Sequence, residues 1–287
     1  MKFFADTACQ EDIDYCFAQG VNDGITTNPK IMESTGDLSI GFEEACKAIL
    51  QRYPNVPVSL ETDLRGIDVI KLRRTSPTQV RNVLLEQASM LSDWAENVVV
   101  KIPVCDGGLL AANYLAKKGI KTNITACMTP YQALLAADYG IGYVSLFANR
   151  MLDSHLLELS GHPLSEISEN PNWKDIVKAA KPEFFEQAWT RTLAQISYVA
   201  KNLDTSRSQL IVGSIRDPQD ITRLVKAEPQ VITIPTKIVK GLENIPGLKD
   251  TKRSFESNGV DQGHSLYHPM TEYTLIEFEK AADSYRN

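Results

Sequence analysis

Short apolar segments rich in β-branched residues alternate along the chain with longer segments of helical periodicity, and this alternation restricts the possible folds most strongly. Strands separated by helices are joined by crossovers, which place them parallel in one sheet with helices packed against it. The chain has 287 residues, which is about the usual length of a (β/α)8 barrel. Eight strands are predicted, at 2–5, 24–26, 56–60, 98–102, 121–124, 142–147, 209–212 and 230–234.

The segments between these strands predict amphipathic helices. They lie at 10–19, 42–52, 77–95, 108–117, 130–139 and 218–226, with two or more helices in 152–202 and another pair after Asp250. We therefore predict one (β/α)8 TIM barrel domain over residues 1–287, with extra C-terminal helices. An open doubly wound sheet is the alternative, although no G-x-G-x-x-G turn follows the first predicted strand.

Composition excludes several classes of function. The net charge of -6 argues against a nucleic-acid binder that relies on a general basic field. No apolar run approaches the ~20 residues of a membrane span, and the start of the chain does not resemble a signal peptide. Five cysteines without a C-x-x-C pair, and four histidines without paired ligand spacing, indicate neither a disulfide framework nor a metal site. We expect a cytoplasmic protein with no metal.

Polar side chains stand at the ends of nearly all the predicted strands. In a barrel, the C-terminal ends of the strands and the loops that follow them build the active site. For any single residue, a helix cap or a solvated loop position remains the alternative. The strand-end residues are Asp6, Thr27, Asn28, Glu61, Lys101, Thr125, Ser145, Phe147, Arg150, Ser214 and Arg216.

Lys101 is the most informative of these residues, because it follows three valines in the apolar stretch NVVVKIPV at 97–104. Removing an ammonium group from water costs several kcal/mol or more. One interpretation is a lysine whose stem packs in the strand while its ammonium group reaches water. The other is a desolvated amine that attacks a carbonyl to form a Schiff base, with the neighbouring carboxyl and hydroxyl groups moving protons.

Six short motifs in order along residues 1–150 resemble those of the transaldolase family. They are ADTA at 5–8, GITTNP at 24–29, VSLETD at 58–63, VVVKIP at 98–103, TNIT at 122–125 and YVSLFANR at 143–150. GSIR at 213–216 and HPMTE at 268–272 continue the resemblance more weakly. The resemblance implies a (β/α)8 barrel with a Schiff-base lysine on the fourth strand, and Lys101 matches that position.

The resemblance also implies catalytic roles. Lys101 would attack the ketone of a ketose phosphate, and Asp6 would take the proton from the hydroxyl next to the carbon–carbon bond that breaks. Glu61 and a water held by Thr125 would move protons as the carbinolamine forms and dehydrates. No cofactor is implied; the expected partners are phosphorylated sugars and, in a homo-oligomer, further copies of the chain.

The implied binding residues divide between the two ends of the sugar. Around the dihydroxyacetone unit the resemblance places Asn28, Thr27, Ser145 and Phe147. Arg150, Arg216 and Ser214 would hold the phosphate, a task that suits guanidinium because its fork binds phosphate oxygens bidentately and stays charged.

Three functions remain open at this point. A transaldolase of the pentose phosphate pathway would move the three-carbon unit from fructose 6-phosphate or sedoheptulose 7-phosphate to an aldose phosphate, and Glu61 and Phe147 are of this type. A fructose 6-phosphate aldolase would release dihydroxyacetone instead. A phosphosugar-binding barrel would have no need of Lys101. Leu146 and Cys105 depart from the family pattern, which leaves room for an unusual acceptor sugar.

Overall fold

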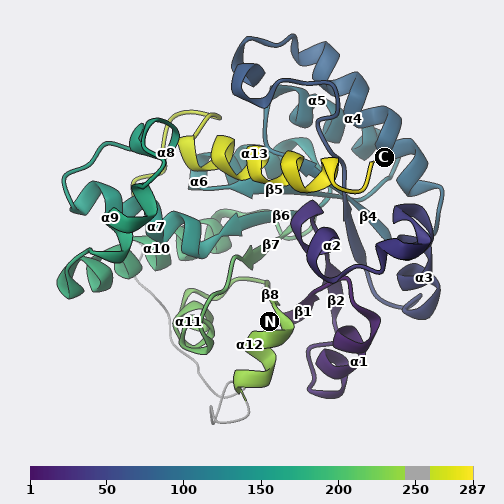
Figure 1. The fold of residues 1–287 in the computed structure, drawn as a ribbon, viewed down its shortest axis with the longest axis horizontal. Helices are drawn as coiled ribbons and strands as arrows, with labels where there is room; N and C mark the ends of the chain where they lie inside the picture. The colour runs from purple at the N-terminus through teal and green to yellow at the C-terminus, as the bar shows by residue number, and fades with distance from the viewer. Residues whose placement is uncertain (243–258, 287) are drawn as a thin grey trace.

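Eight parallel strands form a closed barrel in chain order, β1 to β8, in this computed structural model, which describes residues 1–242 and 259–286. Figure 1 shows the helices arranged around the barrel, with the connections that join successive strands on its outside. The last strand pairs with the first, so Lys2–Ala5 of β1 are in register with Val231–Ile234 of β8. The predicted (β/α)8 fold is confirmed.

All eight predicted strands are present, each within three residues of its expected bounds. The strands are β1 (Lys2–Asp6), β2 (Gly24–Thr26), β3 (Val58–Glu61), β4 (Val98–Pro103), β5 (Thr122–Cys127), β6 (Gly142–Phe147), β7 (Ser208–Gly213) and β8 (Val231–Ile234).

The helices predicted before residue 243 are present in the predicted order, together with two helices outside the predicted ranges, at Pro29–Thr35 and Thr236–Gly241. The helices of the structure are α1 (Gln10–Ala18), α2 (Pro29–Thr35), α3 (Phe42–Arg52), α4 (Pro77–Ser92), α5 (Asp106–Lys117), α6 (Pro130–Tyr139), α7 (Ala148–Leu159), α8 (Glu166–Glu169), α9 (Trp173–Lys178), α10 (Pro182–Asn202), α11 (Pro218–Leu224), α12 (Thr236–Gly241) and α13 (Pro269–Asp283), with 3-10 turns η1 (Leu38–Ile40), η2 (Val69–Arg74) and η3 (Val225–Ala227).

The predicted pair of closing helices is only partly tested. Residues 251–258 lie outside the described part of the chain. Between residues 259 and 286 the structure contains one helix, α13, at Pro269–Asp283.

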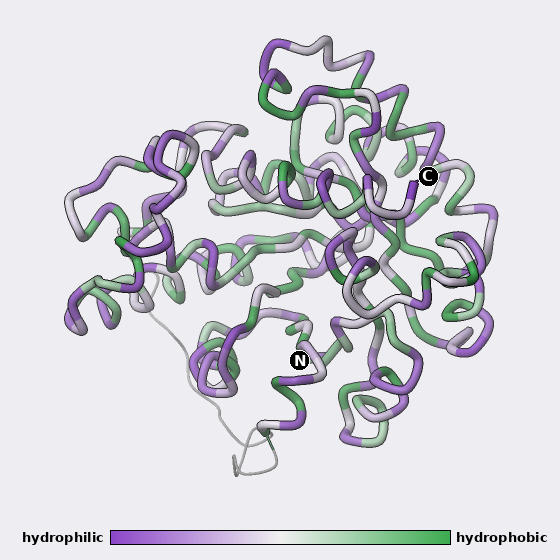
Figure 2. Tube along the Cα trace, in the orientation of Figure 1, coloured by the Kyte–Doolittle hydropathy of each residue, from purple (hydrophilic) through white to green (hydrophobic). Residues whose placement is uncertain are grey.

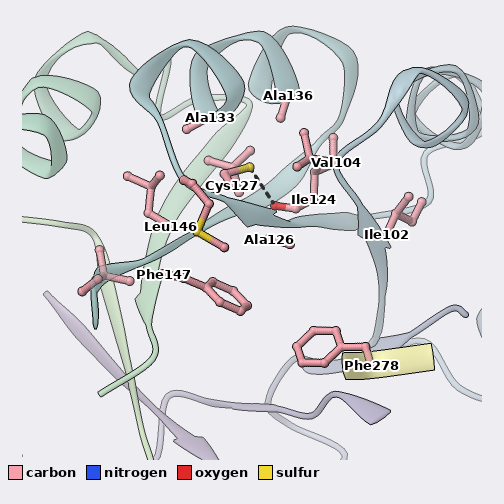
Figure 3. Close-up of a cluster of buried hydrophobic side chains, with 14 of the residues drawn as sticks. Ile102, Val104, Ile124, Ala126, Cys127, Ala133, Ala136, Leu146, Phe147 and Phe278 are labelled. Atoms are coloured by element: carbon pink, nitrogen blue, oxygen red, sulfur yellow. Dashed lines mark hydrogen bonds between the residues drawn. The ribbon is translucent and has the colours of Figure 1, made fainter. Parts of the chain in front are cut away.

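The apolar core fills the layer between the strands and the surrounding helices. Every residue of β3, β4 and β5 is buried, as expected for a parallel sheet covered by helices. Figure 2 shows hydrophobic residues concentrated along the strands, and Figure 3 shows Ile124 and Leu146 on the side of the strands that carries Ala133 and Ala136 of α6. No helix in the described ranges is long and apolar enough to cross a membrane.

Strand alternation explains why Lys101 can lie within this core. Side chains of a strand point alternately to its two faces. Ile102 belongs to the outer apolar layer, so Lys101 faces the barrel interior, where it is in register with Glu61 on β3 and Asn123 on β5. Polar residues on neighbouring strands therefore meet at one level of the barrel.

Helix α13 lies across the C-terminal ends of the strands (Figure 1). It packs against α2, α7, α8, η2 and the end of β5. Near its start, Thr271 donates a hydrogen bond of 2.9 Å to the carbonyl of Ala126, and just after its end Arg286 forms ion pairs with Asp63 and Glu279. The C-terminal helix is thus fastened at both ends over the barrel mouth.

His268 caps this helix and makes its attachment sensitive to pH. The Nδ1 atom of His268 accepts a hydrogen bond of 3.2 Å from the amide of Met270, which requires an unprotonated Nδ1. Burial lowers the pKa of His268 from 6.5 to about 4, against an opposing effect of Glu158. Between these pH values the unfolded chain binds a proton that the folded chain does not, so stability is lost as the pH falls from 6.5 toward 4.

We expect His268→Asn to remove this pH dependence, because asparagine supplies a cap acceptor that does not titrate. The free energy of unfolding of the parent should fall relative to that of the variant between pH 7 and pH 4, by up to about 3 kcal/mol. Urea unfolding at several pH values measures the difference. Curves that stay parallel across this range would contradict the role of His268.

Candidate active site

A cavity of about 430 Å3 opens at the C-terminal ends of the strands. Residues from β1, β2, β4, β5, β6, β7, β8 and α13 line it, so seven of the eight strands contribute. The sequence-predicted residues in its lining are Asp6, Asn28, Lys101, Ser145, Phe147, Arg150 and Ser214.

The amine of Lys101 is held by two oxygens. Nζ donates a hydrogen bond of 2.8 Å to the carbonyl of Thr27 and lies 2.9 Å from Oε2 of Glu61. The side chains of Lys101 and Glu61 are only 5% and 3% exposed. The ammonium group of Lys101 therefore does not reach bulk water, contrary to the first interpretation of this lysine. The structure thus presents a buried amine at a cavity wall, with a carboxylate beside it.

Glu61 is suited to exchange protons near neutral pH. Burial raises the pKa of Glu61 to about 7, although the positive charge of Lys101 acts in the opposite direction. A general acid or base works best when its pKa lies near the working pH. Glu61 can therefore take a proton from the neighbouring ammonium group and return it.

Thr125 is buried on β5, two residues beyond Asn123, the residue in register with Lys101. A bulge between Ile124 and Cys127 interrupts the pairing of β5 with β6, and Ala126 takes a left-handed φ of 63° there. Oγ1 of Thr125 is buried and has no hydrogen-bond partner among the described residues. Buried hydroxyl groups are normally satisfied, so an unpaired one suits a site that takes up water or substrate.

Asp6 provides the second carboxyl group. Thr26 donates a hydrogen bond of 2.7 Å to its Oδ1, which fixes the carboxyl at the end of β1. Burial raises the pKa of Asp6, against the lowering effects of Lys101 and Thr26. The two carboxyl groups, at the ends of β1 and β3, can thus serve two separate proton transfers.

Asn28 and Ser145 are both oriented by contacts within the protein. Oδ1 of Asn28 caps α2 by accepting a hydrogen bond of 2.9 Å from the amide of Ile31, which leaves its NH2 group for the cavity. Pro29 opens α2, where its fixed φ suits the first helical position. Ser145 donates a hydrogen bond of 2.7 Å to Oδ1 of Asn123, which also lines the cavity. Sequence reasoning missed Asn123, although its place in the TNIT motif was an available signal.

Arg150 is a half-buried cation at one end of the cavity. No carboxylate in the described ranges lies within ion-pairing distance of it, and the ring of Tyr273 lies 5.4 Å from its guanidinium carbon. Burial lowers the pKa of Arg150, yet a guanidinium group remains charged in a protein. A desolvated cation without an anion is a suitable phosphate ligand.

Arg216 lines an adjoining cavity together with Arg150. Its NH1 and NH2 atoms donate to the buried carboxylate of Asp153 at 2.8 and 2.6 Å. Ser214, with a left-handed φ of 63°, lies in the turn between β7 and Arg216, and its carbonyl accepts a 2.7 Å hydrogen bond from Asn149. Asp153 was not anticipated, because nothing in the sequence links it to residue 216.

Thr27 and Phe147 have surroundings that refine their predicted roles. The hydroxyl of Thr27 donates to the carbonyl of Ser59 at 2.8 Å, so the contact of Thr27 with the site is through its own carbonyl to Lys101. The ring of Phe147 lies 6.4 Å from that of Phe278 on α13 (Figure 3). Phe278 also lies 5.9 Å from Nζ of Lys101, and sequence reasoning missed it because the contact joins distant parts of the chain.

Fold and cavity together define a closed barrel with a buried amine and two carboxyl groups near one another at the C-terminal ends of its strands. The sequence profile "Transaldolase/Fructose-6-phosphate aldolase" matches residues 3–287. The chain belongs to this family, and it is an enzyme of it.

Individual relatives agree with the profile. The chain is 32% identical over 249 residues to a "Probable transaldolase" of Aquifex aeolicus, covering 86% of this chain and 90% of that protein. It is 34% identical over 248 residues to "Probable transaldolase 2" of Bacillus anthracis, covering 86% and 91%. A solved structure named "Native KDPGal structure" is 12% identical, with a TM-score of 0.43 over 99% of this chain and 96% of that one, a likeness too low to inform its chemistry.

Proposed function

We propose that the protein is a transaldolase-type transferase, which moves a dihydroxyacetone unit from a ketose phosphate to an aldose phosphate through a Schiff base on Lys101. The observation that carries the proposal is the buried Lys101 amine, 2.8 Å from the Thr27 carbonyl and 2.9 Å from Glu61, in the cavity that Arg150 also lines. Fructose 6-phosphate and sedoheptulose 7-phosphate are the proposed donors.

Formation of the Schiff base requires a neutral amine and the loss of water. Glu61 takes the proton of the Lys101 ammonium group, and the amine attacks the ketone carbon, C2. The resulting carbinolamine loses its hydroxyl as water, with Glu61 and Thr125 moving the proton that this step needs. The raised pKa of Glu61, about 7, supports both directions of transfer.

Cleavage then requires a base. Asp6 removes the proton of the C4 hydroxyl, the C3–C4 bond breaks, and its electrons pass into the Schiff base as an enamine. The aldose phosphate leaves, and the enamine adds to the aldehyde of the next aldose phosphate. Asn28 and Ser145 hold the hydroxyl groups of the three-carbon unit, while Arg150, Ser214 and Arg216 hold the phosphate.

Apolar rings beside the lysine favour transfer over release. Phe147 and Phe278 line the cavity and offer no proton donor to the enamine, and the relatives named above carry the name probable transaldolase. The second candidate, a lyase that releases dihydroxyacetone, would need a donor at this position.

The experiment that tests this choice is Phe147→Tyr. The parent should release little dihydroxyacetone from fructose 6-phosphate when no acceptor is present. The new hydroxyl can position a water or donate a proton beside the enamine, so release should rise by about 10² or more. Glu61→Gln should shift the balance in the same direction. If the parent already releases dihydroxyacetone as fast as it transfers it, the lyase assignment replaces the transferase one.

The phosphate assignment predicts a selective effect of Arg150→Ala. Because no carboxylate pairs with Arg150 in the described ranges, the substitution leaves no buried anion behind. The specificity constant for fructose 6-phosphate should fall about tenfold to a hundredfold, the loss of one charge-assisted contact. The constant for unphosphorylated dihydroxyacetone as donor should hardly change. Equal losses on both donors would remove Arg150 from the phosphate site.

A further inference from the structure

A separate cavity of about 220 Å3 lies beside Glu61, and we call it the rear cavity. Its lining comes from the start of α3, the end of β3 with the loop that follows it, α4 and the last described residues of the chain. We call the cavity of about 430 Å3 that Lys101 lines the substrate cavity. Within the part of the chain that the structure describes, the two cavities share no lining residue.

The ion pair of Lys101 and Glu61 stands between the two cavities. Of the two, Lys101 lines only the substrate cavity and Glu61 only the rear cavity, although Nζ and Oε2 are 2.9 Å apart. The proposed nucleophile therefore meets the sugar, while its proposed proton carrier meets a different space.

Glu61 is the carboxylate of the rear cavity with capacity for water. Its neighbour Asp63 is taken up by two guanidinium groups, because Arg65 and Arg286 donate to it at 2.9 and 3.1 Å. The ion pair of Glu61 among the described residues is with Lys101. An ionised carboxylate offers about four acceptor sites, so one ammonium group leaves Glu61 able to accept hydrogen bonds from water.

Exposed side chains connect the rear cavity with the surface. Met90, on α4, is 41% exposed, and the side chain of Arg65 is 53% exposed. Aromatic rings form another part of the wall, where Phe42 stacks on Tyr285 with ring centres 5.2 Å apart. A water molecule takes up about 30 Å3 in the liquid, so the rear cavity has room for several.

We propose that the rear cavity supplies and removes the water of the Schiff-base steps at Glu61, by a route separate from that of the sugar. The inference rests on the proposed function, in which Lys101 and a ketose phosphate form the Schiff base. The Lys101 ammonium group and the ketone give an iminium ion and one water, because the two protons lost by nitrogen end on the departing oxygen. Hydrolysis of the product Schiff base takes up one water and returns both protons to nitrogen.

Separate access for water suits a transferase in particular. The enamine must meet an aldehyde before it meets a proton donor, and Phe147 and Phe278 line the substrate cavity with apolar rings. The same lysine must nevertheless lose one water and take up another in each turnover, while the sugar is covalently bound in the substrate cavity. Water held at Glu61 can attack the iminium carbon with Glu61 as its base, without passing the sugar.

Formate rescue of Glu61→Ala tests this route. The substitution removes the carboxylate and should lower kcat by about 10² to 10⁴. Formate supplies a carboxylate and is larger than water, so a path that admits formate also admits water. We expect formate to restore transfer by about tenfold or more. Its apparent affinity should not change when fructose 6-phosphate is raised from its KM to far above it. Glu61→Ser is run beside Glu61→Ala, because its hydroxyl keeps a polar contact for the Lys101 amine and leaves space for formate.

A plug at the exposed side of the rear cavity locates the entrance. Met90→Trp, added to Glu61→Ala, should raise the formate concentration needed for half-maximal rescue, because the larger side chain narrows the opening. Leu110→Trp is the matched control and should leave that concentration unchanged. Leu110 is a similarly exposed residue on α5 that lines neither cavity.

The outcomes separate the route from the function on which it rests. A formate affinity that weakens in proportion to the sugar concentration would overturn the rear cavity as the route. Folded Glu61 variants that formate does not restore, or equal effects of Met90→Trp and Leu110→Trp, would overturn it as well. Borohydride trapping of the parent with fructose 6-phosphate is run in parallel: labelling of Lys101 together with any of these results rejects the route alone, and failure of the trapping rejects the function.

Discussion

Lys101→Arg is expected to abolish transfer from fructose 6-phosphate, lowering kcat by roughly 10⁴-fold or more, as expected when a covalent nucleophile is lost. Arginine keeps the positive charge beside Glu61 but cannot supply a neutral amine at the working pH. The measurement is the rate of aldose phosphate formation at saturating donor and acceptor. A variant that retains a tenth of the parent rate would exclude Lys101 as the nucleophile.

Lys101→Met controls for the size of the arginine side chain. It removes the amine and its charge, and Glu61 can then become neutral by protonation, because its pKa of about 7 already lies near working pH. Leaving a charge buried and unpaired costs about 3–5 kcal/mol, and protonation avoids much of that cost. We expect Lys101→Met to fold and to be as inactive as Lys101→Arg, which circular dichroism and urea unfolding would verify.

Asp6→Asn is expected to separate Schiff-base formation from carbon–carbon cleavage. The amide cannot accept the C4 hydroxyl proton, so kcat should fall by about 10² to 10⁴, the range for loss of one general base. The Schiff base should still form, because Lys101 and Glu61 are unchanged. Borohydride should therefore trap the intact six-carbon sugar on the variant.

The control for Asp6→Asn is Thr26→Val, which removes the 2.7 Å hydrogen bond to Asp6 but keeps the carboxyl. We expect a smaller loss of kcat than with Asp6→Asn. If Asp6→Asn instead prevents trapping altogether, Asp6 acts before the Schiff base forms and the assigned proton transfer is wrong.

The barrel and much of its site were predictable because strand ends have a fixed geometry. Strands joined by helical crossovers run parallel, so residues at their C-terminal ends meet at one rim. Asp6, Glu61 and Lys101 each end or nearly end a strand, and the register of β3 with β4 brings the last two side by side. This pairing needs only the strand pattern and the alternation of faces.

Contacts made by the C-terminal helix could not be predicted in the same way. Phe278 and Tyr273 lie more than 120 residues along the chain from the residues they meet, Phe147 and Arg150, and no periodicity joins them. Their places depend on how α13 crosses the barrel mouth, which tertiary packing decides. Asp153 was missed for a related reason, since its partner Arg216 follows a different strand.

Reduction with borohydride in the presence of fructose 6-phosphate, followed by peptide mass spectrometry, tests the central assignment most directly. The Schiff-base mechanism predicts one reduced sugar adduct per chain, on Lys101. Lys30 and Lys237 line the same cavity and serve as internal controls that should remain unlabelled. An adduct on either of them, or no adduct on any lysine, would contradict the mechanism.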